Sequence, residues 1–132
     1  MTCWAVALAG GEGVRLRPLV RRVWGIDRPK QYVRLLGPRT LLRQTLDRIS
    51  LLIPAERTLV VTVRHHAGYI DEEFPGAARP TILAQPLDRG TGAGVLYPAH
   101  WIAWRNPEAI VAVFPSDHFF QDEARFVGMS AR

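Results

Sequence analysis

Apolar residues are concentrated in four short runs along the chain, separated by longer segments of mixed polarity. The runs have the length of strands and cover Cys3–Ala9, Arg57–Val63, Thr81–Pro86 and Ala109–His118. The first run, CWAVALA, is apolar throughout, as in a strand that is buried on both faces. It ends at glycines, the third run ends at a proline, and the fourth runs into polar residues. The pattern therefore predicts four strands.

The segments between these runs predict helices. Thr40 is suited to cap a helix that continues to about Ser50, in which apolar residues fall three and four positions apart. Residues 65–74 predict a second helix and residues 93–104 a third, while residues 21–38 predict an irregular stretch. In the third helix, Tyr97, Trp101 and Trp104 form one stripe and Leu96, Ala99 and Ala103 an opposite one. We expect one stripe to pack on the sheet.

Strands that alternate with helices imply right-handed crossovers, and hence an α/β fold. We expect a Rossmann-like sheet, parallel or mixed, with helices on both faces. Ligands of such sheets bind outside the carboxyl ends of the strands. Three polar segments follow predicted strands and should meet at this edge: the loop GGEG, the loop QPLDRGTG and the loop PSDH.

Composition is that of one globular domain, and the charge is unevenly placed. The chain has 132 residues, 48% of them hydrophobic, and a net charge of +5. Ten basic and two acidic residues lie between Arg15 and Arg48, directly behind the glycines. This excess implies a polyanion, either a nucleoside triphosphate or a nucleic acid. Lys30 is the single lysine among 17 basic residues, which suggests that this position requires a compact ammonium group and not a guanidinium.

Targeting and redox signals are weak. The lone cysteine, Cys3, cannot form an internal disulfide. The glycines begin within ten residues of the N-terminus, so no secretory leader pattern precedes them, and no apolar run approaches membrane-spanning length. We expect a soluble, cytoplasmic protein with no membrane partner.

The glycine loop has the composition of a phosphate-binding device but matches neither of two common ones. Leu16 stands where a dinucleotide fingerprint needs its third glycine, and the lysine and hydroxyl residue of a P-loop are missing. What remains is a loop whose glycines let backbone N–H groups approach a nucleotide, followed closely by Arg15.

The stretch LAGGEGVRLRPL, followed by RPKQYV, resembles the signature of the sugar-1-phosphate nucleotidyltransferases, most closely the mannose-1-phosphate guanylyltransferases. The likeness continues through TLLRQTLDRI, QPLDRGTGAG and FPSDHFF in the same order. It implies that residues 1–132 form part of the nucleotide-binding domain of such an enzyme. These enzymes transfer a nucleoside monophosphate from a nucleoside triphosphate, here GTP, to a sugar 1-phosphate, here mannose 1-phosphate, and release pyrophosphate.

The resemblance also implies roles for particular residues. Arg15 would hold the outgoing phosphates, Lys30 would neutralise the α-phosphate and the sugar phosphate, and Asp117 would bind Mg²⁺. The nucleotide contacts would be Leu8, Ala9, Gly10, Gly11, Glu12, Gly13, Gln85, Gly90 and Thr91. The base site departs from the family, which usually has an acidic residue where this chain has Gln85. A glutamine amide can match the edge of guanine, but equally that of uracil or thymine.

His65 and His66 are adjacent histidines that the pattern does not assign to a metal site. His65 and His66 begin the second predicted helix without a partner at metal-ligand spacing, so we expect a surface or capping role for them and no zinc site.

Family members are far longer, and the chain ends about where their nucleotide half ends. We therefore expect the chain alone to be a poor catalyst, with an open sheet edge that favours self-association. Three classes of function stay open. The leading one is a nucleotidyltransferase, the second is a catalytically inactive nucleotide-binding module, and the third, disfavoured, is a nucleic-acid-binding protein.

Overall fold

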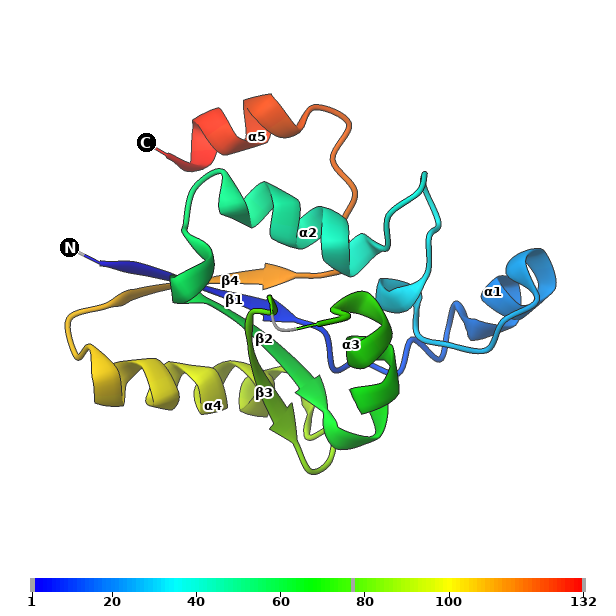
Figure 1. Cartoon of the computed structure of the whole chain (residues 1–132), viewed down its shortest axis with the longest axis horizontal. Coiled ribbons are helices and arrows are strands. Elements are labelled where there is room, and N and C mark those ends of the chain that lie inside the picture. The colour runs from blue at the N-terminus through cyan, green and yellow to red at the C-terminus, as the bar shows by residue number, and fades with distance from the viewer. Residues whose placement is uncertain (1, 77, 132) are drawn as a thin grey trace.

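We analysed a computed structural model of the chain, which describes residues 2–76 and 78–131 (Figure 1). The strands are β1 (Cys3–Leu8), β2 (Thr58–Val63), β3 (Thr81–Gln85) and β4 (Ile110–Pro115). The α-helices are α1 (Arg17–Trp24), α2 (Leu41–Ser50), α3 (Ala67–Glu73), α4 (Gly90–Arg105) and α5 (Glu123–Ser130). Short 3-10 helices are η1 (Lys30–Tyr32), η2 (Ala55–Arg57) and η3 (Arg64–His66).

The strands form one sheet in the order β3-β2-β1-β4. Each neighbouring pair is parallel, so the sheet is parallel and not mixed. Figure 1 shows α4 on one face of the sheet and α2 on the other, with α5 beyond α2. The predicted Rossmann-like α/β fold, with helices on both faces, is confirmed.

Two apolar cores lie on the two faces, because successive side chains of a strand point to opposite sides. Ala5 and Ala7 of β1 face Leu42 and Ile49 of α2 in one core. Val6 faces the other core with β2, β3 and Ile102 of α4. Both cores meet the sheet at β1 and β2, and every residue of β2 is buried. The pair β1–β2 is therefore the rigid base of the loops that follow it.

Helix α2 confirms its prediction, whereas α1 was not predicted. Thr40 caps α2, since its hydroxyl oxygen accepts a hydrogen bond from the backbone N–H of Arg43 at 3.1 Å. Helix α1 carries Pro18 in its first turn and ends at Gly25, which has a φ of 67°. These are start and stop signals of a helix. Only Val20 of α1 is buried, so the apolar periodicity that reveals a core-facing helix is weak there.

Helix α4 differs from its prediction in start and in packing. It begins at Gly90 and not at residue 93, and its buried residues are Gly94, Pro98 and Ile102. Neither predicted stripe forms the buried face, because small residues and a proline let the helix lie close to the sheet. Trp101 is partly buried at the margin of the core under α4, with its ring centroid 5.9 Å from that of Trp4, and Trp104 is 82% exposed.

The last strand, β4, is shorter than predicted. β4 stops at Pro115, three residues before the predicted end at His118, and α5 follows without having been predicted. β4 is an edge strand whose Ile110 is 50% exposed. Within the ranges that the structure describes, no helix has the length and apolar character needed to cross a bilayer.

Candidate functional site

Two adjoining hollows open at the carboxyl edge of the sheet. The Lys30 hollow has a volume of 280 Å³ and is lined by Leu8, Gly10, Gly11, Gly13, Lys30, Gln31, Thr91, Pro115, Ser116 and Asp117. The Gln85 hollow has a volume of 150 Å³ and is lined by Leu8, Gly10, Gly11, Val61, Gln85, Asp88, Gly90, Thr91 and Gly94. Because the two linings share the glycine loop and Thr91, they form one continuous crevice.

The fold brings most of the sequence-predicted site residues to this crevice. Those that line it are Leu8, Gly10, Gly11, Gly13, Lys30, Gln85, Gly90, Thr91 and Asp117. The other three lie apart from the linings. Ala9 is fully buried beneath the loop, Glu12 turns its carboxylate toward His65, and Arg15 is exposed in the turn before α1. The roles of all twelve residues stay predictions.

The glycine loop is held by two side chains from η1. The side-chain N–H groups of Gln31 donate to the carbonyl oxygens of Ala9, at 3.1 Å, and Gly11, at 2.8 Å. The Tyr32 hydroxyl donates to the Ala9 carbonyl at 2.8 Å. Sequence reasoning missed both residues, although two polar groups in the stretch PKQYV were an available signal. These bonds leave the loop N–H groups free of η1 and fix the path of the loop.

Tyr32 is neutral at physiological pH. Its hydroxyl lies 2.9 Å from the Thr62 hydroxyl oxygen, and burial raises the pKa of Tyr32 to about 12 even though the Thr62 hydrogen bond acts in the opposite direction. A neutral hydroxyl keeps its proton for a hydrogen bond to a carbonyl. Tyr32 therefore acts as a permanent donor under the loop.

Gly13 sets the distance between the loop and η1. Its φ is 64°, in the left-handed region that favours glycine, and a Cβ built there would lie 3.2 Å from the backbone nitrogen of Lys30. Its carbonyl oxygen accepts hydrogen bonds from the N–H groups of Leu16 and Arg17, where α1 starts. Any larger residue would push η1, and with it Lys30, away from the loop.

Lys30 and Asp117 form an ion pair across the crevice. The Lys30 Nζ lies 2.6 Å from the Asp117 Oδ2, and each side chain is 29% exposed. The neighbouring Ser116 hydroxyl donates to the carbonyl of Leu8 and so ties the end of β4 to the end of β1. The pair presents an ammonium group to an anion and carboxylate oxygens to a cation, beside a loop of backbone N–H groups.

The Gln85 hollow is built on the first turn of α4. Asp88 accepts a hydrogen bond from the backbone N–H of Gly90 at 2.9 Å. Gly94, one turn further, lies beside Gln85, and a Cβ built there would be in ordinary contact with the Gln85 Oε1 at 4.0 Å. Free N–H groups at the N-terminus of this 16-residue helix add partial positive charge to the crevice.

Most of the basic segment is neutralised by ion pairs. Seven of the ten basic residues between Arg15 and Arg48 contact carboxylates: Arg17, Arg21, Arg28, Lys30, Arg39, Arg43 and Arg48. Several of the carboxylates come from outside the segment, such as Glu72, Glu73 and Glu123. The sequence-local charge excess is therefore not a continuous basic surface, which weighs against nucleic acid as the ligand.

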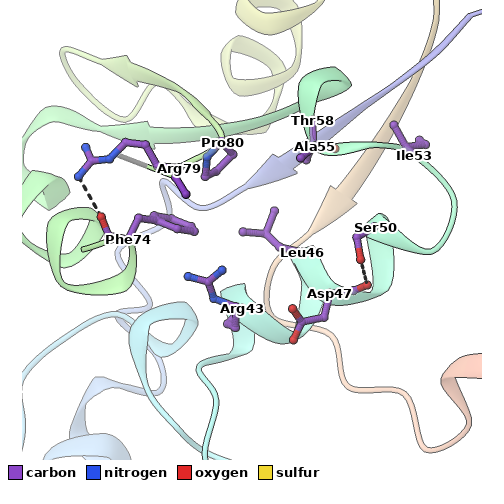
Figure 2. Close-up of a pocket in the computed structure, with 11 residues that line it drawn as sticks. Arg43, Leu46, Asp47, Ser50, Ile53, Ala55, Thr58, Phe74, Arg79 and Pro80 are labelled. Atoms are coloured by element: carbon purple, nitrogen blue, oxygen red, sulfur yellow. Dashed lines mark hydrogen bonds between the residues drawn. The ribbon is translucent and has the colours of Figure 1, made fainter. Parts of the chain in front are cut away.

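Another cavity, of 340 Å³, lies at the opposite edge of the sheet. Figure 2 shows Thr58 and Pro80, next to the starts of β2 and β3, on one side of it and Leu46 of α2 on the other. Arg43 and Arg79 also line this cavity, and Arg79 donates to the Phe74 carbonyl at 3.2 Å. It contains none of the predicted site residues.

His65 and His66 differ from each other in burial. His65 is 54% exposed, in keeping with the predicted surface role. His66 is 1% exposed and lies against the rings of Tyr32 and Tyr69, so a surface role is wrong for it. It occupies the N-cap position of α3, but its side chain makes no capping hydrogen bond. The turn η3 directs the two successive side chains to different environments, and the sequence alone does not distinguish them.

The chain belongs to the nucleotidyl transferase family, whose model matches residues 4–129. At 33% identity over 126 residues, it is similar to mannose-1-phosphate guanylyltransferase 2 of Escherichia coli, with 92% of this chain and 25% of that protein covered. At 31% identity over 123 residues, it is similar to the alginate biosynthesis protein AlgA of Pseudomonas aeruginosa, with 92% and 24% covered. The chain thus spans about a quarter of the length of these curated relatives.

A solved structure supports the same family. The chain superposes on a protein described as a mannose-1-phosphate geranyltransferase from Thermus thermophilus with a TM-score of 0.82 and 34% identity. The match covers 99% of this chain and 37% of the other. A nucleotidyl transferase from Methanothermobacter thermautotrophicus, 20% identical, shares the fold with a TM-score of 0.70. The resemblance inferred from the motifs is confirmed at the level of the family.

Proposed function

We propose that the chain binds a nucleoside triphosphate with Mg²⁺ in the crevice and forms the nucleotide half of a mannose-1-phosphate guanylyltransferase. The observation that carries this proposal is the Lys30–Asp117 pair beside the glycine loop, with 2.6 Å between Nζ and Oδ2. An ammonium group, a carboxylate and free backbone N–H groups within one hollow match the charges of a phosphate chain and its cation. The similarity to guanylyltransferases favours GTP and mannose 1-phosphate.

In the proposed reaction, an oxygen of the sugar 1-phosphate forms a bond to the α-phosphorus. The bond from this phosphorus to the oxygen that bridges to the β-phosphate breaks, and pyrophosphate leaves. All reacting groups are anionic, so positioning and neutralisation of charge supply most of the catalysis. Lys30 neutralises the α-phosphate, and Arg15, exposed in the turn before α1, holds the leaving phosphates.

The Asp117 carboxylate fits Mg²⁺, which usually takes one or two carboxylates together with phosphate oxygens. The ion would shield the charge of the phosphate chain. Asp117 already holds one cationic group, the Lys30 ammonium, so its oxygens are oriented toward positive charge in the crevice.

The Gln85 hollow is the proposed base site. Gln85 is 8% exposed and lines this hollow at the end of β3, where its amide can donate and accept. The order of nucleotide preference, with GTP first, is part of the proposal. Substitution of Gln85 by leucine should reduce discrimination among GTP, UTP and dTTP in a competition assay, and leave the affinity for pyrophosphate nearly unchanged.

Calorimetry with GTP and Mg²⁺ tests the phosphate half of the proposal. We expect Arg15→Ala to weaken binding by about 1.5 to 3 kcal/mol, the usual contribution of a hydrogen bond to a charged group. Arg125→Ala, which removes an exposed arginine from α5, is the matched control and should bind like the unchanged protein. Equal affinities for the two variants would remove Arg15 from the site.

Two further measurements separate the classes of function. Formation of GDP-mannose from GTP and mannose 1-phosphate by the whole protein distinguishes an enzyme from an inactive nucleotide-binding module. A nucleic-acid-binding protein would instead lose affinity for DNA or RNA steeply as salt rises, because it releases many counterions.

A further inference from the structure

Glu12, His65 and His66 form a cluster at the glycine loop, and none of the three lines the Lys30 hollow or the Gln85 hollow. One ligand atom from each residue, a carboxylate oxygen or a ring nitrogen, lies within 4.8 Å of the other two. Glu12 follows β1 and the histidines follow β2. These strands pair in parallel, with Leu8 opposite Val61, so their carboxyl ends bring the three side chains together.

The buried histidine of this cluster has no hydrogen-bond partner for either ring nitrogen in the part of the chain that the structure describes. A buried polar group costs stability when it stays unsatisfied, and a native protein seldom leaves it so. The His66 Nε2 lies 3.4 Å from the Glu12 Oε1, and the ring is held in place by Tyr32 and Tyr69, at 5.6 Å from each centroid. The His66 Nε2 therefore lies beside the Glu12 carboxylate without a hydrogen bond to it.

The donor set and spacing select the kind of ion. Two imidazole nitrogens and one carboxylate oxygen suit a zinc-like ion, whereas Mg²⁺ prefers oxygen ligands throughout. Bonds of about 2.0 to 2.1 Å in a tetrahedral site place two ligand atoms about 3.3 to 3.4 Å apart. The His66 and Glu12 ligand atoms, 3.4 Å apart, have this spacing. The His65 Nε2 lies closer than this to the same Glu12 oxygen, so these two atoms must separate to bind one ion. His65, which contacts Glu12 and is exposed, completes three protein ligands with a fourth position for water.

We propose that Glu12, His65 and His66 bind a zinc-like divalent cation, at a site distinct from the Mg²⁺ site proposed at Asp117. The ion ties the glycine loop to the start of α3. Arg17, whose Nη1 lies 3.7 Å from the Glu12 Oε2, then keeps its contact through the carboxylate oxygen that the ion does not use. The cation is a structural clamp on the loop and takes no part in the transfer reaction.

Titration of the untagged, chelator-treated full chain with zinc tests this proposal. We expect one zinc ion per chain by calorimetry, the visible absorption of tetrahedral cobalt when Co²⁺ replaces zinc, and no displacement by excess Mg²⁺. Glu12→Gln and His65→Ala each change a partly or largely exposed side chain and should weaken zinc binding by at least about 10-fold. His100→Ala, which removes an exposed histidine of α4, is the matched control and should bind zinc like the unchanged chain.

Nuclear magnetic resonance of the unchanged chain locates the zinc ion without any substitution. Zinc should shift the ring resonances of His65 and His66 and leave those of His100 and His118 in place. Unchanged zinc affinity in Glu12→Gln or His65→Ala would overturn the proposal, as would resonance shifts confined to His100 or His118, or no zinc binding at all.

Discussion

The two hollows of the crevice are held by different kinds of interaction. The Lys30 hollow depends on bonds between segments far apart in the chain, such as Gln31 to Ala9, Ser116 to Leu8 and Lys30 to Asp117. The Gln85 hollow shares Leu8, Gly10 and Gly11 with it, but its α4 side depends on local geometry, above all the bond from the Gly90 N–H to Asp88 two residues before. The Lys30 hollow is therefore coupled to global stability, whereas the Gln85 hollow can change without loss of the fold.

The largest predicted effect on this contrast is a loss of stability at high pH, caused by ionisation of Tyr32 beneath the glycine loop. Its pKa of about 12 in the folded protein lies above the ordinary value of 10, so folding favours the protonated hydroxyl. The corresponding stability is fully present below pH 10 and is lost as pH rises from 10 to about 12. We expect a loss on the order of 2 to 3 kcal/mol in the free energy of unfolding.

Urea unfolding over this pH range, compared between the unchanged chain and Tyr32→Phe, measures the effect. The phenylalanine variant is less stable at neutral pH, since it lacks the bond to Ala9, but it should lose less stability as pH rises. Parallel curves for the two proteins would show that Tyr32 does not titrate as the fold implies.

A smaller loss of stability is expected when Gly13 is replaced, whereas the nearby Gly11 should tolerate replacement. Gly13→Ala places a Cβ 3.2 Å from the Lys30 nitrogen and 3.4 Å from the Pro29 Cα at a φ of 64°, and should cost about 1 to 3 kcal/mol of stability. It should also weaken GTP binding, because Lys30 moves. Gly11→Ala is the matched control, since its Cβ meets nothing within 4 Å. Thermal unfolding of both variants checks this, and equal losses of stability would contradict the role assigned to Gly13.

The smallest expected loss of stability follows from replacing Asp88, which lines the Gln85 hollow. Asp88→Ala removes the acceptor for the Gly90 N–H at an exposed position, and we expect a cost of about 0.5 to 1 kcal/mol in stability. Asp88→Asn keeps an acceptor and should restore most of it. If Asp88→Ala destabilised the chain as much as Gly13→Ala, the contrast between the two hollows would be wrong.

Sequence patterns predicted the parts of the fold that depend on neighbours in the chain. The apolar runs located the four strands to within three residues at each end, and the carboxyl-edge rule brought Gly10, Thr91 and Asp117 together. The contacts of Gln31 and the burial of His66 were missed, because they arise between segments twenty or more residues apart. Helix α1 was missed since little of its apolar surface packs on the rest of the chain.

The most direct test of the central claim is to locate the nucleotide by amide chemical shifts. The isotope-labelled chain is titrated with GTP and Mg²⁺, and the shifts of the backbone N–H groups are followed. We predict the largest changes at Gly10, Gly11 and Gly13 and in the first turn of α4, at Gly90 and Thr91. Changes concentrated instead around Arg43 and Arg79, in the cavity of Figure 2, would contradict the proposed site.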